Sequence, residues 1–186
     1  MSGGGSACQD QPLKTKNLTL RPHVPAHLIA LSESEEAYEK ISGYAAAPGI
    51  RDFLLMASPA FFESLKTASE MDPWRFGFAI VRTAGNLVIG LCGFTGPPDS
   101  DRCVEIGYSI VPTYQGRGLA TEAAGALINF SIPNQVRKVR AHTLTEISAS
   151  TRVLEKCGFT RTGEIVDPEG KLVWRWERSC SSPCRG

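Results

Sequence analysis

The sequence predicts a mixed α/β domain, in which a mixed β-sheet carries helices on its faces. Two observations predict it: short apolar or alternating runs bounded by turn residues, and longer stretches with apolar residues at helical spacing. These segments follow one another in the order β, α-α, β-β-β, α, β, α, β-β. A strand–helix–strand sequence requires at least one crossover connection, so we expect part of the sheet to be parallel.

One strand and two helical stretches are predicted in the N-terminal part of the chain. Residues 18–22 alternate apolar and polar side chains and end at a proline, which is typical of a strand. Residues 25–44 favour helix. A second helical stretch begins at Ser58 and Pro59, because serine is a common N-cap and proline is accepted at the first helical position.

Three consecutive strands are predicted next. Residues 76–82 and 87–94 flank the Gly85-Asn86 dipeptide, which is typical of a hairpin turn, and residues 104–111 form the third strand. The remaining elements are predicted from apolar stripes and turn residues: a helix from residue 119, a strand over 136–144, a short helix over 148–157, and a hairpin of residues 159–166 and 172–177.

Length and composition indicate one ordinary globular domain. The chain has 186 residues, of which 42% are hydrophobic and 21% charged, so it can bury its own core. Its 20 Lys and Arg against 19 Asp and Glu leave a net charge of +1, which argues against a broad nucleic-acid-binding face but allows one local phosphate pocket. We expect a flexible leader over residues 1–16, the domain over 17–178 and a short tail over 179–186.

The sequence predicts no membrane partner. No apolar run approaches the ~20 residues that cross a bilayer. The first residues lack the basic flank and apolar stretch of a secretory signal, so we expect a cytoplasmic protein. The 6 cysteines are scattered, and Cys180 and Cys184 have no second Cys/His pair nearby, so we predict neither a disulfide framework nor a metal site.

The most specific signal is the segment 115–120, Gln-Gly-Arg-Gly-Leu-Ala, between a predicted strand and a predicted helix. Gly116 and Gly118 allow successive backbone N–H groups to turn inward, and a helix start attracts anions through unpaired amides and its dipole. The segment is not the dinucleotide pattern, whose third glycine would fall on Thr121, nor a phosphate loop, which needs Gly-Lys-Ser/Thr. A tight turn that binds no ligand is the alternative.

Further motifs accompany this loop. The loop fits the pattern Gln/Arg-x-x-Gly-x-Gly/Ala, residues 20–22 read Leu-Arg-Pro, and residues 105–108 read Glu-Ile-Gly-Tyr. Residues 149–159 read Ala-Ser-x-Arg-Val-Leu-Glu-Lys-x-Gly-Phe. In these motifs and their order, residues 18–178 resemble the GNAT superfamily of acetyl-CoA-dependent N-acetyltransferases, and within it the RimJ/RimL-like branch.

The resemblance implies a mostly antiparallel sheet of six to seven strands, about four helices on its faces, and a splayed parallel strand pair that holds acetyl-CoA. The pantetheine arm would pair like an added strand beside Ile110 and Val111, whose N–H groups would polarise the thioester carbonyl. The pyrophosphate would be bound by the backbone amides of Gln115, Gly116, Arg117, Gly118, Leu119, Ala120 and Thr121.

Acetyl transfer to an amine requires the neutral amine, so a base is useful. Glu105 is the first candidate, because a carboxylate within an apolar strand is costly unless it is paired or functional. A salt bridge or a solvent-facing position is the alternative explanation. His142 is the second candidate, because histidine titrates near neutral pH, and a structural histidine is the alternative.

Two positions depart from the family pattern. Leu154 stands where many members carry a tyrosine that protonates the departing thiolate, so the resemblance assigns this role to Ser150. A first-turn serine that bonds its own backbone is the alternative for Ser150. Ile147 replaces an asparagine that usually touches the cofactor arm, which removes a hydrogen-bonding side chain.

The predicted function is therefore acetyl-CoA-dependent transfer of an acetyl group to a primary amine, by direct attack in a ternary complex. The acceptor is a protein N-terminus or a small-molecule amine, and the chain is a monomer or a homodimer. One alternative is an acyl-CoA-binding module without transfer activity. Another is a protein-interaction domain that binds no CoA.

Overall fold

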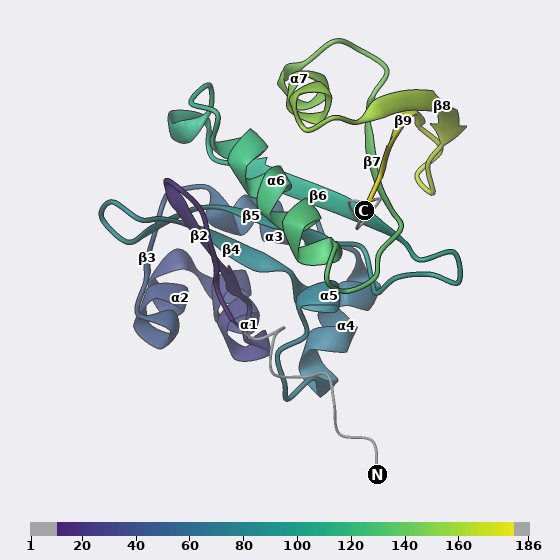
Figure 1. Ribbon diagram of the computed structural model, residues 1–186. Coiled ribbons are helices and arrows are strands. Elements are labelled where there is room, and N and C mark those ends of the chain that lie inside the picture. The colour runs from purple at the N-terminus through teal and green to yellow at the C-terminus, as the bar shows by residue number, and fades with distance from the viewer. Residues whose placement is uncertain (1–10, 181–186) are drawn as a thin grey trace.

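A nine-stranded β-sheet forms the centre of the computed structural model, which describes residues 11–180 (Figure 1). The strands are β1 (Leu13–Lys14), β2 (Leu18–Pro22), β3 (Ala45–Ala46), β4 (Phe78–Arg82), β5 (Leu87–Phe94), β6 (Cys103–Ile110), β7 (Lys138–Leu144), β8 (Thr160–Val166) and β9 (Leu172–Ser179). Their order in the sheet is β1-β2-β4-β5-β6-β7-β9-β8, with β3 beside β5. All pairs are antiparallel except β3–β5 and β6–β7. This confirms the predicted mixed, mostly antiparallel sheet with a parallel pair. Residues 11–180 form nine strands and seven α-helices, more than the six to seven strands and about four helices expected, because β1 and β3 have only two residues each and several helices are short.

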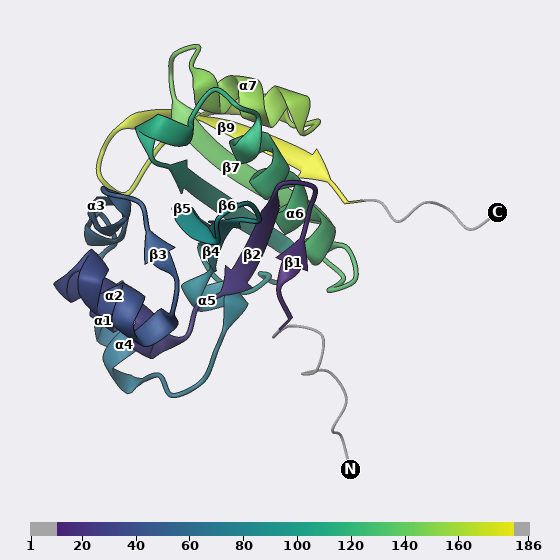
Figure 2. The ribbon, with the colours of Figure 1, turned by 90° about the vertical axis from the view of Figure 1, so that its left-hand side faces the viewer.

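Helices lie on both faces of this sheet. They are α1 (Pro25–Glu33), α2 (Glu35–Ser42), α3 (Ile50–Leu55), α4 (Pro59–Thr67), α5 (Pro73–Phe76), α6 (Leu119–Ser131), α7 (Ala149–Lys156) and a 3₁₀ helix (Pro112–Tyr114). Helix α6 packs on one face against β2, β5 and β6, while α1 to α5 gather on the other face (Figures 1 and 2). Helix α7 lies with β7, β8 and β9. None of the helices within residues 11–180 has the length and apolar composition of a membrane span.

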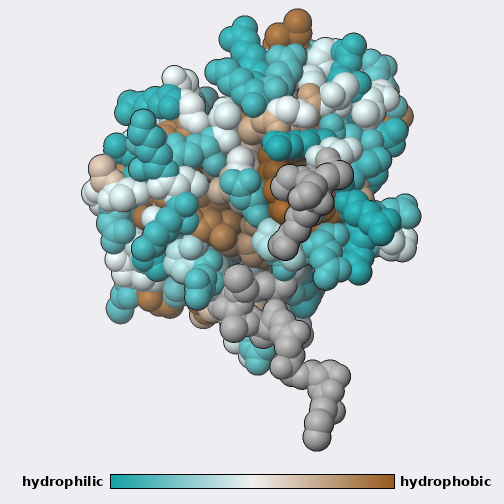
Figure 3. Space-filling model, in the orientation of Figure 1, coloured by the Kyte–Doolittle hydropathy of each residue, from teal (hydrophilic) through white to brown (hydrophobic). Residues whose placement is uncertain are grey.

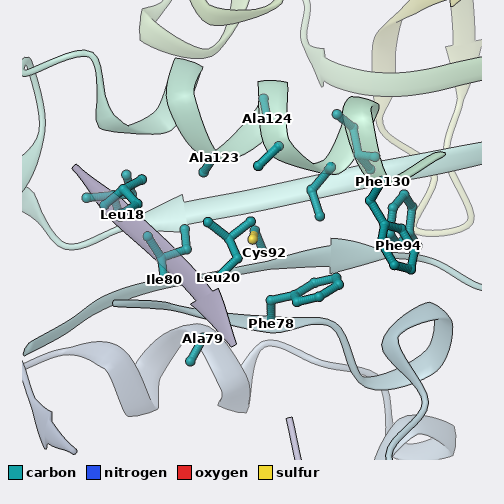
Figure 4. Close-up of a cluster of buried hydrophobic side chains, with 14 of the residues drawn as sticks. Leu18, Leu20, Phe78, Ala79, Ile80, Cys92, Phe94, Ala123, Ala124 and Phe130 are labelled. Carbon is teal, nitrogen blue, oxygen red and sulfur yellow. The ribbon is translucent and has the colours of Figure 1, made fainter. Parts of the chain in front are cut away.

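The hydrophobic core lies on both faces of the sheet, and the part between α6 and the strands is shown in Figure 4. Ala123 and Ala124 are both 0% exposed, and their small side chains let α6 approach the strands closely. Farther along α6, the Phe130 ring lies 5.6 Å from that of Phe78 and 5.8 Å from that of Phe94, between centroids. Burying each such side chain contributes about 1.5–3 kcal/mol. This packing fixes α6, and with it the loop before the helix.

The surface in the orientation of Figure 3 is hydrophilic around its edges, and hydrophobic residues gather near its middle, over the sheet and α6.

The N-terminal helical stretch differs from the prediction. Residues 25–44 were predicted as one helical stretch, but Ser34 is extended (φ −164°, ψ 164°) and separates α1 from α2. Its side chain accepts a hydrogen bond from the Ala37 N–H, so the serine acts as the N-cap of α2. The short helices α3 and α5 were not predicted. The strand predicted over residues 76–82 begins at Phe78 instead, because residues 73–76 form α5.

The sheet begins earlier than the sequence analysis expected. Leu13 and Lys14 pair with β2, so these residues of the predicted leader belong to the sheet. Glu122 of α6 holds the same segment, accepting hydrogen bonds from the Asn17 N–H at 2.6 Å and Nδ2 at 2.9 Å. Strand β9 likewise extends to Ser179, one residue into the predicted tail. The rest of the predicted leader and tail, residues 1–10 and 181–186, lie outside the described residues.

The contact between β5 and β6 predicts the effect of a single methyl group. A Cβ added to Gly90 would lie 2.2 Å from the Ser109 carbonyl oxygen and 3.2 Å from the Ile110 Cα, so the backbone of β6 must shift. We expect Gly90→Ala to lower the free energy of unfolding by about 1–3 kcal/mol in urea denaturation.

The matched control is Gly125→Ala within α6, where the added Cβ meets nothing within 4 Å. This control is expected to raise the free energy of unfolding by about 0.5–1 kcal/mol, because glycine weakens a helix interior. An unchanged urea midpoint for Gly90→Ala would contradict the close approach of β5 and β6.

Candidate active site

The parallel strands β6 and β7 pair over only three residues of each. The register joins Cys103 to Lys138, Val104 to Val139 and Glu105 to Arg140. Beyond Glu105 the two strands are no longer paired, and β7 continues with β9 and β8 as a separate group of strands (Figure 1). The second half of β6 therefore has an edge with no strand beside it.

Backbone groups of β6 face this gap. The Thr95 N–H donates to the Glu105 carbonyl, and the Val111 N–H donates to the Ile89 carbonyl, both at 3.0 Å. Because the backbone groups of an antiparallel strand alternate between its two sides, those of Tyr108 point away from β5 and into the gap. The Ile110 backbone points the same way, but its carbonyl accepts a hydrogen bond from the Gln115 side chain at 2.7 Å.

Unpaired amides line the other side of the gap. Gly116 and Gly118 have φ angles of 72° and 76°, which glycine adopts without strain, and they turn the chain into α6. Glu122 is the first residue of α6 whose N–H bonds back, to the Gly118 carbonyl at 3.0 Å. Within residues 11–180, the six N–H groups of residues 116–121 donate no hydrogen bond. These donors and the positive end of the α6 dipole favour an anion.

A cavity of about 530 Å³ occupies this gap. Its walls are the end of β6, the loop before α6 and the first turn of that helix, one side of α7 with the preceding Ser148, and Phe53 of α3. The side chains of Arg152 and Lys156, on α7, belong to the wall, so two cations border the unpaired amides. The lining residues are Phe53, Tyr108, Ser109, Ile110, Tyr114, Gln115, Gly116, Gly118, Leu119, Ala120, Thr121, Ser148, Ala149, Ser150, Arg152, Val153 and Lys156.

Most residues of the predicted cofactor site lie in this lining. They are Ile110, Gln115, Gly116, Gly118, Leu119, Ala120 and Thr121, together with the predicted donor Ser150. Val111 does not lie in the lining: it is 0% exposed, and its N–H is already bonded to Ile89, so it cannot polarise a thioester. The Gln115 N–H, which was predicted to bind the pyrophosphate, is also occupied, because it donates to the Pro112 carbonyl at 3.2 Å. The Arg117 side chain turns away and donates to the Thr113 carbonyl at 3.2 Å, which leaves only its backbone beside the cavity.

The two candidate bases contact each other. The Glu105 Oε1 atom lies 2.9 Å from the His142 Nδ1 atom, and the side chains are 33% and 20% exposed. The His142 Nε2 atom is buried and has no partner among the described residues. Because side chains alternate along a strand, Glu105 lies on the same face of β6 as Gly107 and Ser109. That face borders a second cavity.

The second cavity has a volume of about 290 Å³ and lies on the α1–α5 side of the sheet. Phe53, Tyr108 and Ser109 line both cavities, so the two hollows meet at these residues. The other lining residues come from α1, α3, α4, α5, β5 and β6 and their flanking turns: His23, Leu28, Leu54, Ala57, Phe61, Arg75, Phe76, Gly77, Leu91, Cys92, Gly93, Phe94, Thr95 and Gly107.

Tyr108 stands at this junction, and the sequence analysis assigned it no role. Its hydroxyl donates to the Ser150 carbonyl at 3.4 Å and so links β6 to the start of α7 across the gap. Burial raises the pKa of the Tyr108 phenol well above its usual value, which keeps it protonated at neutral pH. The Glu-Ile-Gly-Tyr motif contained this residue, but only the strand register shows that it reaches both cavities.

Residues 17–160 match a family model described as the acetyltransferase (GNAT) domain. The chain belongs to the GNAT acetyltransferase family. The matched range contains the splayed strands, the loop before α6 and all of α7, so the family assignment covers both cavities. The RimJ/RimL-like branch stays a prediction, because the family model describes the GNAT domain as a whole. Residues 11–180 contain no group of three or more His, Cys, Asp or Glu side chains placed to hold a metal ion.

Curated relatives match part of the chain. The uncharacterized N-acetyltransferase YjdG of Bacillus subtilis is 32% identical over 81 residues, which is 43% of this chain and 48% of that protein. The uncharacterized N-acetyltransferase p20 of Bacillus licheniformis is 29% identical over 100 residues, 52% of this chain and 56% of that protein. The chain thus spans about half the length of the curated relatives it matches.

Solved structures share the fold over nearly the whole chain. The ribosomal-protein-S5-alanine acetyltransferase of Vibrio fischeri superposes with a TM-score of 0.64 at 16% identity, covering 93% of this chain and 98% of that one. A GNAT-family acetyltransferase of Bacillus anthracis gives a TM-score of 0.60 at 19% identity, covering 92% and 100%. At these identities the likeness concerns the fold.

Proposed function

We propose that the chain is an acetyl-CoA-dependent N-acetyltransferase that acetylates a primary amine in a ternary complex. The observation that carries this proposal is the run of six unpartnered amides at the start of α6, beside the free edge of β6. A similar fold, the microcin C7 self-immunity acetyltransferase MccE, has been solved with acetyl-CoA and AMP, with a TM-score of 0.59 at 14% identity.

The residues around the larger cavity suit the parts of acetyl-CoA. The amides of residues 116–121 would hold the pyrophosphate, because a helix start offers several N–H donors to one anion. Arg152 and Lys156 would add charge complementarity toward the phosphates. The backbone of Tyr108 and the Ile110 N–H would pair with the amides of the pantetheine arm as a sheet edge pairs with an added strand. Bound acetyl-CoA supplies the activated acetyl group.

Glu105 is the proposed base. Its carboxylate lies on the face of β6 that borders the second cavity, where we place the acceptor amine, but Glu105 lines neither cavity. The amine proton would therefore pass to Glu105 through water. His142, whose Nδ1 atom lies 2.9 Å from the Glu105 Oε1 atom, would orient the carboxylate.

Ser150 is the proposed proton donor to the thiolate. The residue lies near the start of α7 in the wall of the larger cavity, and its hydroxyl forms no hydrogen bond within residues 11–180. The Tyr108 hydroxyl bonds the Ser150 carbonyl and would hold the serine in position. In the transfer, the nitrogen of the neutral amine bonds the acetyl carbon as the C–S bond breaks. The amine loses one proton toward Glu105, the sulfur gains one from Ser150, and solvent takes up the proton from Glu105 and returns one to Ser150.

The unpaired N–H groups of residues 116–121 predict the effect of a negative charge at Gly118. We expect Gly118→Glu to abolish acetyl-CoA binding in isothermal titration calorimetry, because the carboxylate would occupy the place proposed for the pyrophosphate. The matched control is Gly85→Glu in the β4–β5 hairpin, where φ is also positive (88°) and an added Cβ also meets nothing within 4 Å. Both variants carry the same backbone strain of about 1–2 kcal/mol. Equal acetyl-CoA affinity in the two variants would refute the proposal that the N–H groups of residues 116–121 bind the pyrophosphate.

The role proposed for Glu105 as the base predicts a specific kinetic change. Glu105→Gln keeps the shape of the side chain but cannot accept the amine proton. We expect kcat to fall by about 10²–10⁴-fold and its pH profile to change. The affinity for acetyl-CoA is expected to stay near that of the wild type. An unaltered pH profile of kcat would transfer the role to His142 or to bulk water.

The role proposed for Ser150 as the proton donor predicts a smaller change in kcat. Ser150→Ala is expected to lower kcat by at least about 10-fold with little change in KM for acetyl-CoA, because only the thiolate-forming step uses the hydroxyl. Ser64→Ala on α4 is the control, since the Ser64 hydroxyl bonds only the Phe61 carbonyl and Ser64 lines neither cavity. If Ser150→Ala retains full kcat in steady-state assays, the thiolate is protonated by another group.

Release of the free CoA thiol separates this proposal from its alternative, an acyl-CoA-binding module. Each acetyl transfer liberates one thiol, which a colorimetric thiol reagent counts while a panel of amines is supplied. Stabilisation by acetyl-CoA in a melting experiment, with no thiol released by any amine, would favour the binding module. Ligand at 100 times its dissociation constant would add about 2.7 kcal/mol of stability.

A further inference from the structure

The second cavity has a specific chemical character. Its wall is built mostly from aromatic and aliphatic side chains, including Phe53, Phe61, Phe76 and Phe94. No aspartate or glutamate belongs to the described lining. Its volume of about 290 Å³ lies at the small end of ligand pockets, which suits one small molecule.

Arg75 supplies the one cationic side chain of this wall. It is the third residue of α5, is exposed, and stacks its guanidinium over the Phe76 ring at 5.3 Å. No carboxylate within residues 11–180 forms an ion pair with it. The nearby Asp72 carboxylate instead caps α5 and accepts the N–H groups of Trp74 and Arg75. An unneutralised guanidinium at an aromatic cavity favours an anionic ligand group.

His23 adds a buried polar atom to the same wall. The residue is 3% exposed, and its Nε2 atom has no hydrogen-bond partner among residues 11–180. Burial is the main cause that lowers the pKa of the imidazole to about 3, so His23 is neutral at physiological pH and adds no second charge. A buried nitrogen without a partner is costly, and a polar ligand group would relieve that cost.

We propose that this cavity binds a free α-amino acid with an aromatic or large aliphatic side chain as the acetyl acceptor. The inference rests on the N-acetyltransferase function proposed above and names its substrate class. Arg75 binds the carboxylate, and the phenylalanine rings surround the side chain. The amine points to the junction formed by Phe53, Tyr108 and Ser109, where the larger cavity begins.

The reaction is the one given above, with this acceptor. The α-amine forms the N–C bond, the thioester C–S bond breaks, and the products are an N-acetyl amino acid and CoA. The amine proton leaves toward Glu105, the sulfur is protonated by Ser150, and solvent takes up the proton from Glu105 and returns one to Ser150. No oxidant, reductant or metal ion enters this balance.

Other amines fit the cavity less well. A polyamine would place a second ammonium group in a wall without carboxylates and beside Arg75, so desolvation and like-charge repulsion both oppose it. A peptide N-terminus has an amide where the amino acid has its carboxylate, and it would leave the Arg75 charge unpaired.

Acceptor selectivity tests the proposal. Thiol release from acetyl-CoA is followed with L-phenylalanine, with 2-phenylethylamine, which lacks the carboxylate, with spermidine, and with the peptide amide Phe-Gly-Gly-NH₂. We expect L-phenylalanine to have the highest kcat/KM, at least about 10-fold above that of 2-phenylethylamine, which corresponds to one charge-assisted contact.

Arg75→Ala is expected to reduce the ratio of the two kcat/KM values about 10-fold, toward unity. Arg161→Ala is the matched control: Arg161 is also exposed and stacked on an aromatic ring, at 4.4 Å from the Trp174 centroid, but it lines neither cavity. The control is expected to keep the wild-type ratio. A ratio unchanged by Arg75→Ala would overturn the carboxylate contact.

The assay separates failure of this inference from failure of the transferase function. Thiol release with spermidine or with the peptide amide, in excess of that with L-phenylalanine, contradicts the amino-acid acceptor and leaves the transferase function standing. No thiol release with any acceptor, although acetyl-CoA raises the melting temperature, contradicts transfer itself. Acetylation of L-phenylalanine, identified by mass spectrometry as its N-acetyl derivative, supports both.

Discussion

The short pairing of β6 with β7 is the constraint on which the rest of the site depends. A parallel pair extended to the end of β6 would bond the backbone groups of Tyr108 and Ile110 and close the gap. Instead the pairing stops at Glu105 and Arg140. Beyond that point β7 separates from β6 and pairs only with β9, which in turn pairs with β8. The larger cavity, the free strand edge and the junction with the second cavity all follow from this separation.

The two cavities differ in the part of the chain that offers the contacts. Backbone groups dominate the larger one, where amides of the loop before α6 remain unbonded and the β6 edge is open. Ile147, which stands at the position of the asparagine in the resemblance, is 79% exposed and is not part of either wall. The smaller cavity is lined by residues with large side chains, among them Arg75 and Phe61.

Glu105 and His142 lie where the two halves of the sheet part. Glu105 is the last residue of β6 that pairs with β7, and it pairs with Arg140. His142 lies two residues beyond Arg140 on β7. Their 2.9 Å contact therefore spans the start of the gap between β6 and β7. The sequence analysis treated the two residues as competing bases, whereas the structure brings them together.

The order of the strands and long helices, and the loop at residues 115–120, were determined by the sequence, because periodicity, turn residues and local motifs act over a few neighbouring positions. Short elements such as α3, α5 and β1 escaped prediction, because tertiary contacts rather than their own few residues stabilise them. Residue 111 shows the same limit at the site: the motif placed it beside the cofactor, but its N–H belongs to a bond with Ile89 on another strand. Only the tertiary structure decided which backbone groups stay free, where Tyr108 reaches, and that Arg75 and His23 share a wall with β5 and β6, because each depends on segments far apart in the chain.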